Sequence, residues 1–109
     1  MKRTWLQNNK HWFDRSTALE FKEDTIWDGS NSISVNTFDQ WIRQILYLTA
    51  SDTPAWVLGT VGNEQADYRQ ISDDEAVSWL ARNGYDESEY GLPDRFRSLI
   101  KKHLADVKV

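Results

Sequence analysis

Alternation of residue types between residues 40 and 58 predicts a β-hairpin. Odd positions from 41 to 49 would share one face of the first strand and even positions from 42 to 48 the other, because side chains alternate along a strand. The odd set is Trp41, Arg43, Ile45, Tyr47 and Thr49, and the even set is Ile42, Gln44, Leu46 and Leu48. Residues 51–54 are turn formers, and residues 55–58 (Ala-Trp-Val-Leu) resume a strand pattern.

Weaker patterns predict further short elements around this hairpin. Strands are expected near residues 10–13, 33–35 and 67–71, and residues 59–64 are expected to form a loop. Thr17 and Glu20 have the spacing of a capping box, which predicts a short N-terminal helix over residues 16–23. The Trp27-Asp28-Gly29-Ser30-Asn31 stretch has the composition of a turn.

Two helices are predicted in the last third of the chain. The first covers residues 73–83, with Ser72 and Glu75 as a capping box and Gly84 in a left-handed C-cap. The second covers residues 93–106, with Pro93 at its first position. Its apolar stripe is Phe96, Leu99, Ile100, His103, Leu104 and Val107.

Together these elements predict an α+β fold: a three- to four-stranded antiparallel meander packed by the two C-terminal helices, with a short N-terminal helix. The expected core is Trp41 or Leu46, Trp56, Leu58, Val77, Leu80, Phe96, Leu99 and Ile100. A chain of 109 residues is expected to form a single domain over residues 1–109. It has six tryptophans, which indicates either an aromatic core or rings that meet a partner.

Composition narrows the classes of function. The chain has no cysteine, which excludes disulfides and thiolate chemistry. It has no apolar run of membrane-spanning length and no secretion signal behind its basic start, so a cytoplasmic protein without a membrane partner is expected.

Charge is separated along the sequence. Residues 1–22 and residues 93–109 each hold five Lys/Arg against two Asp/Glu, whereas residues 23–92 hold three against thirteen. The formal net charge is −4. A solvated acidic surface explains this pattern, and so does a surface that steers a charged partner.

The sequence favours a protein without catalytic activity, metal or cofactor. Of the two histidines, His103 falls on an apolar helical stripe and His11 lies in a segment without clear structure. Asp24, Asp28 and Asn31 do not have calcium-loop spacing. The glycines at 59 and 62 match no phosphate-binding pattern.

Three segments carry a resemblance: residues 23–31 (EDTIWDGSN), residues 46–49 (LYLT) with 55–58 (AWVL), and residues 71–84 (ISDDEAVSWLARNG). Over residues 10–84 the chain resembles a group of small bacterial proteins, mostly uncharacterised, that are carried on phages, plasmids and other mobile elements. The resemblance implies a context of genetic conflict, in which small proteins often act by binding. It implies no catalytic residues and no particular partner.

These observations favour a protein-binding inhibitor or adaptor, monomeric or homodimeric, whose partner has a basic surface. One example would be a blocker of a host nucleic-acid-binding defence complex. Its expected contact residues combine acids with aromatics: Glu23, Asp24, Trp27, Asp28, Tyr85, Asp86, Glu87, Glu89 and Tyr90. Alternatively, Trp27 closes the end of the sheet and the tyrosines cover a helix.

A second hypothesis is a nucleic-acid-binding regulator that uses the basic last helix. Its phosphate contacts would be Arg95, Arg97, Lys101 and Lys102. A sequence pI near 5.1 makes nucleic acid the less favoured partner, because phosphate binding requires a positive footprint.

Overall fold

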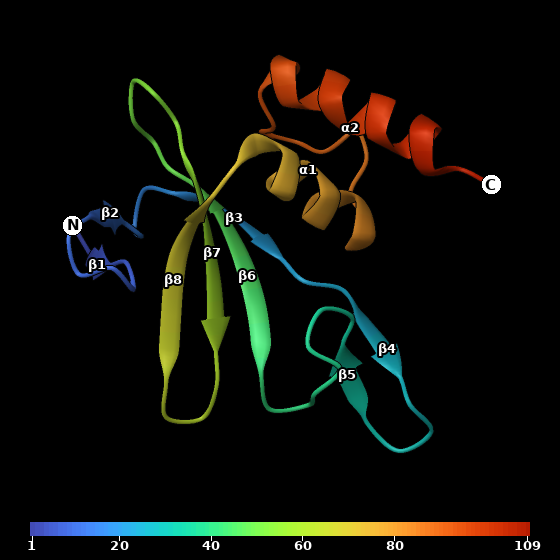
Figure 1. Cartoon of the computed structure of the whole chain (residues 1–109), viewed down its shortest axis with the longest axis horizontal. Coiled ribbons are helices and arrows are strands. Elements are labelled where there is room, and N and C mark those ends of the chain that lie inside the picture. Colours follow the sequence, from blue (N-terminus) through green and yellow to red (C-terminus); the bar gives the residue numbers. More distant parts are fainter. The chain divides into compact units, whose positions relative to one another are not determined.

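The computed structural model describes residues 1–109 as an α+β protein of eight strands and two helices (Figure 1). Its contacts divide the chain into two compact units, Met1–Ile71 and Ser72–Val109. All strands lie in the first unit and both helices in the second. The α+β class is confirmed, while a single domain and the packing of the helices on the sheet stay predictions.

The first unit is built on a four-stranded antiparallel sheet. Its strands are β3 (Leu19–Lys22), β6 (Arg43–Leu48), β7 (Trp56–Val61) and β8 (Ala66–Ile71), in the order β3-β6-β7-β8. The predicted hairpin is β6–β7, with Tyr47 opposite Val57. The expectation of a loop at residues 59–64 is wrong for 59–61, because β7 continues to Val61 and pairs with both neighbours.

An N-terminal hairpin covers one face of this sheet. It consists of β1 (Arg3–Trp5) and β2 (Trp12–Asp14), so the strand expected near residues 10–13 falls at 12–14. Leu6 and Phe13 are buried in one cluster with Tyr47, Val57 and Tyr68. The Gln7 amide donates to the Tyr68 carbonyl at 2.7 Å, which ties the hairpin to the β8 edge.

The short helix predicted over residues 16–23 is wrong. Residues 15–18 form a turn, in which the Asp14 carboxylate accepts hydrogen bonds from Ser16. The Ser16 hydroxyl bond, followed by the bond from the Lys2 amide, lowers the pKa of Asp14. The chain then enters β3, where buried Phe21 alternates with exposed Glu20 and Lys22. The alternation of buried and exposed residues is that of a strand, so the capping-box spacing of Thr17 and Glu20 is a coincidence.

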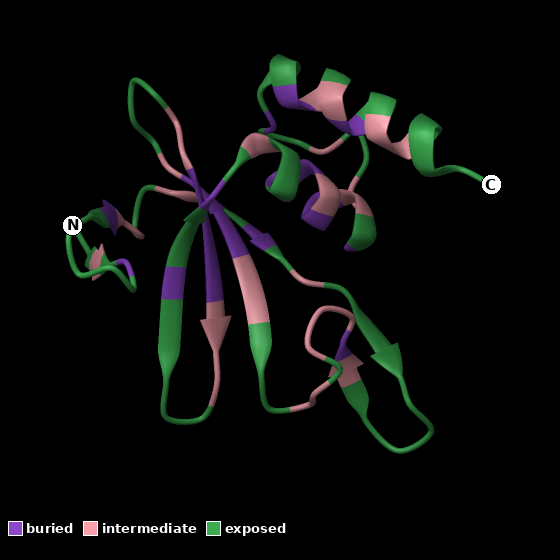
Figure 2. Ribbon diagram, in the orientation of Figure 1, coloured by how far each residue is buried: buried purple, intermediate pink, exposed green.

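The opposite face of the sheet is also apolar. Phe21, Leu46 and Trp56 are buried there, and the rings of Phe21 and Trp56 have centroids 5.8 Å apart. Of the two residues proposed for this core, Leu46 is fully buried whereas Trp41 is 62 % exposed. Burial along the strands is shown in Figure 2.

The second unit is a helical hairpin of α1 (Asp73–Arg82) and α2 (Asp94–Val107). The capping box of Ser72 and Glu75 is confirmed, and Gly84 has the predicted positive φ of 86°. Pro93 is the N-cap of α2 rather than its first residue, so the helix begins one position later than predicted. The predicted core residues of this unit are buried except Leu99, which is half-buried: Val77, Leu80, Phe96 and Ile100.

Candidate protein-binding surface

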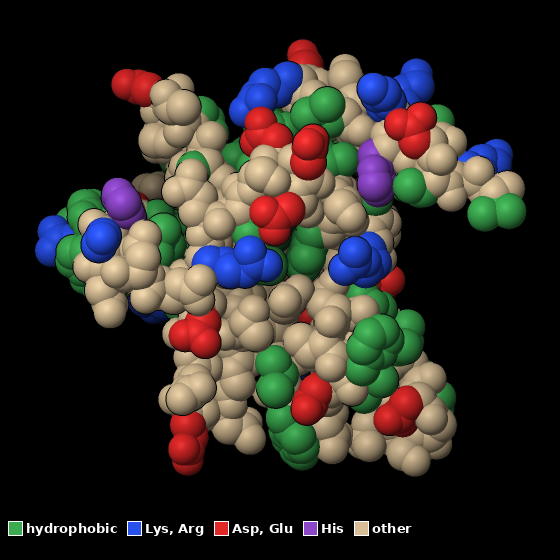
Figure 3. All heavy atoms as spheres, viewed as in Figure 1, with side chains coloured by type: hydrophobic (Ala, Val, Ile, Leu, Met, Phe, Trp, Pro, Cys, Tyr) green, Lys and Arg blue, Asp and Glu red, His purple; other side chains and the backbone are tan.

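Residues 23–42 leave the main sheet after β3 and return to it at β6; we call them the β4–β5 segment. The segment contains a small antiparallel hairpin of β4 (Thr25–Trp27) and β5 (Ser32–Ser34). It carries four acids, Glu23, Asp24, Asp28 and Asp39, and no Lys or Arg. Over β4 and β5, Figure 3 shows hydrophobic and acidic side chains beside one another.

The turn between β4 and β5 is fixed by Asp28. Its Oδ1 accepts hydrogen bonds from the amides of Asn31 at 2.7 Å and Ser30 at 2.8 Å. These bonds, that of Asn31 first, lower the pKa of Asp28. Gly29 supplies the positive φ of 102° that the turn requires. The tight turn leaves Trp27, the last residue of β4, at the hairpin tip.

Three aromatic rings of the segment are directed to solvent. Phe38 is 71 % exposed, Trp27 69 % and Trp41 62 %. Ile26 and Ile42 add exposed aliphatic surface. The alternative in which Trp27 closes the end of the sheet is therefore wrong. Exposed rings of this size within one short segment are typical of an interaction surface.

Phe38 is also held in an uncommon backbone conformation. Its φ is 56°, a left-handed value that is disfavoured for a bulky side chain. Two backbone bonds around the same turn hold it, from Phe38 N to Ser34 O at 2.9 Å and from Ser34 N to Asp39 O at 3.1 Å. Burial does not explain the strain, because the ring lies in solvent. The conformation of Phe38 is therefore set by the backbone of the turn and not by packing of its ring.

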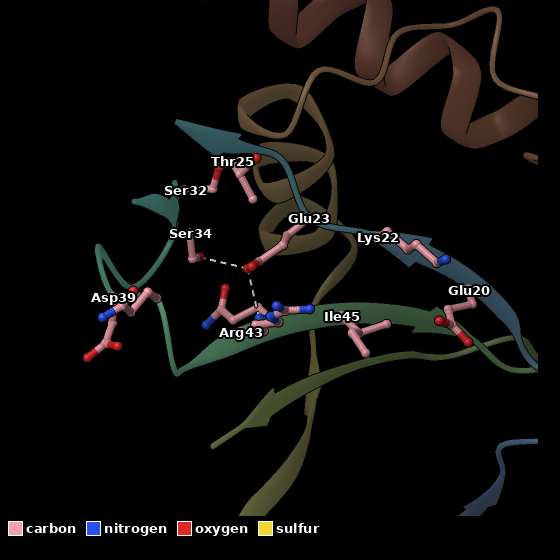
Figure 4. A pocket seen from close by; sticks show the side chains of 11 residues that line it. Glu20, Lys22, Glu23, Thr25, Ser32, Ser34, Asp39, Arg43 and Ile45 are labelled. Atoms are coloured by element: carbon pink, nitrogen blue, oxygen red, sulfur yellow. Dashed lines mark hydrogen bonds between the residues drawn. The ribbon is translucent and has the colours of Figure 1, made fainter. Parts of the chain in front are cut away.

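Glu23 anchors the β4–β5 segment to the main sheet. Its Oε1 accepts hydrogen bonds from the buried Ser34 hydroxyl at 2.6 Å, the Gln44 amide at 2.8 Å and the Asn36 side chain at 3.3 Å. In Figure 4 the carboxylate points toward Ser34 and the backbone of β6 beside Arg43. Glu23, predicted as a contact residue, thus points inward. It fixes the segment rather than presenting charge to a partner.

A cavity of about 320 Å³ lies beside this anchor. Glu20, Lys22, Asp39 and Arg43 contribute charged side chains to its wall, so charges of both signs face one space. Figure 4 shows their side chains pointing in different directions rather than converging on one point. We therefore interpret the cavity as the space left where the β4–β5 segment joins β6.

Replacing Glu23 by alanine is expected to lower the free energy of unfolding by about 1–3 kcal/mol, because three donors lose their acceptor. Glu23→Gln keeps one side-chain oxygen in place and is expected to lose less. Urea unfolding of both variants measures the difference, and amide exchange at Gln44 reports on the anchor itself. If Glu23→Ala matched the wild type in both measurements, the anchoring role would be refuted.

The other predicted contact residues lie in the second unit, in the loop between α1 and α2. Asp86 accepts hydrogen bonds from the hydroxyl and amide of Ser88, and these bonds lower its pKa. Tyr90 is 93 % exposed, whereas Tyr85 is half-buried and its amide donates to the Leu80 carbonyl at 3.0 Å. Glu87 is exposed and Glu89 is half-buried. This loop thus offers a further exposed aromatic, Tyr90, with acids beside it.

Sequence reasoning missed Phe38, Asp39 and Trp41 as site residues. The alternation pattern places Trp41 on a strand face, although β6 begins at Arg43. The available signal was compositional: residues 23–42 combine four acids with large apolar residues and contain no cation. The left-handed conformation at Phe38 left no signal in the sequence.

No group of three or more His, Asp or Glu side chains is placed to hold a metal ion. Neither helix combines the length and the apolar character that crossing a membrane requires. No protein-family model, curated protein or solved structure matches the chain. The resemblance to proteins of mobile elements therefore stays an expectation.

Proposed function

We propose that the protein is a small non-enzymatic protein-binding module that holds a basic segment of its partner on the β4–β5 segment. The observation that carries this proposal is the exposure of Trp27, Phe38 and Trp41 in a stretch that has three acids besides the inward-pointing Glu23 and no cation. The loop with Asp86, Glu87, Glu89 and Tyr90 provides a second contact region of the same character.

This combination suits arginine or lysine side chains of a partner. A cation can stack on the face of a tryptophan ring while a neighbouring carboxylate takes its charge. Tryptophans supply large contact areas at a low cost in side-chain entropy, which is why they are frequent binding hot spots. Asp28 and Glu23 hold the backbone of the segment in place, so little ordering is required when the partner binds.

The proposed biological role is that of an inhibitor or adaptor of phage or mobile-element origin. An acidic surface with exposed rings is suited to occupying a basic groove, such as one that a host defence protein uses for nucleic acid. Small size, charge separation and the sequence resemblance support this role.

The second hypothesis, a nucleic-acid-binding regulator using α2, is less well supported. Arg95 is paired with Asp73 at 3.0 Å and lies over the Phe96 ring. Arg97 donates to the carbonyls of Leu92 and Glu87. Two of the four cations proposed to bind phosphate are thus engaged within the unit.

Neutralising the acids of the segment tests the proposal. In Asp24→Asn/Asp28→Asn/Asp39→Asn the amide oxygens can still accept the hydrogen bonds that shape the turns, while three charges are removed. We expect affinity for a fluorescent arginine–serine repeat peptide to fall about tenfold at low salt. The loss should shrink at about 0.5 M salt, because screening then limits the attraction between charges to a few ångströms.

Asp52→Asn/Glu64→Gln/Asp67→Asn is the matched control. It removes the same number of charges from exposed positions of the first unit outside the segment. The control should bind the peptide like the wild type. Equal losses in the two triple variants would show attraction by net charge alone, and wild-type protein that does not bind the peptide would refute the proposal.

A further inference from the structure

The N-terminal hairpin has one buried and one exposed face. Leu6 and Phe13 point to the sheet and are each 6 % exposed. Trp5 and Trp12 occupy the opposite face, where they are 50 % and 42 % exposed. The aromatic pair is not required to cover the sheet, because the other face of the hairpin does so.

Register brings these two tryptophans together. Trp5 and Trp12 are directly opposite one another in the β1–β2 ladder. The neighbouring pair, Leu6 and His11, is hydrogen-bonded through Leu6 N and His11 O at 2.9 Å. Hydrogen-bonded and non-hydrogen-bonded pairs alternate in an antiparallel ladder, so Trp5 and Trp12 form a non-hydrogen-bonded pair, whose side chains lie closest. The two half-exposed rings are therefore neighbours on one face of the hairpin, and we call this pair the Trp5–Trp12 platform.

The hairpin that carries the platform is rich in cations. Residues 1–13 contain Lys2, Arg3 and Lys10 and no acid. The Arg3 guanidinium lies over the Trp12 ring, 4.8 Å from its centroid. Asp14, the last residue of β2, accepts three hydrogen bonds from Lys2 and Ser16. With Asp14 counted, the side chains of residues 1–14 still carry a net charge of +2 on a protein of net charge −4.

We propose that this hairpin binds single-stranded nucleic acid, with bases stacked on Trp5 and Trp12 and phosphates beside Lys2, Arg3 and Lys10. Aromatic rings flanked by cations are the general means by which proteins hold single strands without reading their sequence. A duplex fits less well, because its bases are already stacked on one another. An acidic peptide would use the cations but would leave both ring faces without a flat partner.

Within the first unit, the acidic β4–β5 segment is separated from the hairpin. The hairpin is tied to β8, and the acidic β4–β5 segment continues from β3, at the opposite edge of the sheet (Figure 1). A polyanion bound at the hairpin is therefore kept away from the acidic β4–β5 segment, which would repel it. This binding site is separate from the proposed protein-binding surface and does not depend on it.

Fluorescence anisotropy with a short labelled oligothymidine at about 50 mM salt tests the proposal. We expect salt-sensitive binding with a log–log slope no steeper than about −2, because three cations are available. Trp5→Ala/Trp12→Ala should weaken binding by about tenfold or more, whereas Trp5→Phe/Trp12→Phe should recover part of the loss because phenylalanine still stacks. Near-ultraviolet circular dichroism checks that the core is unchanged.

A charge-matched pair locates the phosphate contacts. Lys2→Gln/Lys10→Gln should weaken binding and flatten the salt dependence, while Lys101→Gln/Lys102→Gln on α2 should leave both unchanged. The proposal is refuted if wild-type protein does not bind the oligonucleotide, or if the double alanine variant binds as well as the wild type. Tighter binding of a glutamate–serine repeat peptide or of duplex DNA would also refute it.

Discussion

Replacing Gly59 by alanine is expected to destabilise the protein by about 1–3 kcal/mol, the usual cost of overpacking. A Cβ at this position would meet Tyr68 Cε1 at 2.9 Å and Cδ1 at 3.1 Å, and Tyr47 Cε2 at 3.4 Å. The Tyr68 ring cannot move aside freely. Its hydroxyl accepts a hydrogen bond from Arg15 at 2.8 Å, and its centroid is 5.9 Å from that of Phe13.

The displaced ring should also loosen the N-terminal hairpin, which packs on Tyr47 and Tyr68 through Phe13. Thermal unfolding is expected to show a midpoint lower by roughly 5–15 °C. Amide exchange at Gln7, whose N–H bonds to the Tyr68 carbonyl, should accelerate. The two effects together would identify Gly59 as the residue that makes room for the aromatic cluster.

Gly62→Ala provides the control, because the same methyl group meets nothing closer than the Gln65 carbonyl at 3.8 Å. Its effect should be near zero, or stabilising by up to about 1 kcal/mol through the unfolded chain. If Gly59→Ala and Gly62→Ala had equal stabilities, the packing assigned to Gly59 would be incorrect.

Removing both exposed tryptophans of the β4–β5 segment should cause the largest loss of partner binding. In Trp27→Ala/Trp41→Ala, affinity for the arginine–serine repeat peptide is expected to fall by at least about tenfold, since truncated hot-spot tryptophans commonly cost about 2 kcal/mol or more. Unlike the loss caused by neutralising acids, this loss should persist at high salt. Titration calorimetry at two salt concentrations measures both properties.

The fold should be unaffected by this change, because Trp27 and Trp41 are mostly exposed. Unchanged thermal unfolding would confirm that the loss belongs to binding. Trp27→Phe/Trp41→Phe should keep much of the affinity, because a phenyl ring still offers a face to a cation. An alanine variant that binds like the wild type would show that the rings are exposed for another reason.

The parts of the fold that are predictable from sequence are those with local causes. Strict alternation located the β6–β7 hairpin, and the capping box at Ser72 located the start of α1. Residues 16–23 misled because Thr17 and Glu20 have helix-capping spacing by chance, while pairing with β6 makes the segment a strand. From the sequence, Gly59 is expected in a loop. The reason for a glycine within β7 is the close approach of the Tyr47 and Tyr68 rings, which only the folded sheet shows.

The candidate site was predictable only in part, for a related reason. The turn at Asp28 is set by residues next to it, and its composition located an exposed Trp27. Glu23 looks like any surface acid until the fold brings Ser34 and Gln44 to its carboxylate. The platform of Trp5 and Trp12 depends on the register of the hairpin and on the packing of Phe13 against the sheet. Neither can be predicted from the pattern of residues 1–13.

The indole resonances of the tryptophans test the central claim most directly. The chain has six tryptophans, and each contributes one side-chain N–H signal in a nitrogen–proton correlation spectrum. On titration with the arginine–serine repeat peptide, the signals of Trp27 and Trp41 should shift in a saturable way. Those of buried Trp56 and Trp79 and of the N-terminal Trp5 and Trp12 should stay in place. Saturable shifts confined to Trp5 and Trp12, or no saturable shift at Trp27 and Trp41, would contradict a protein-binding role for the β4–β5 segment.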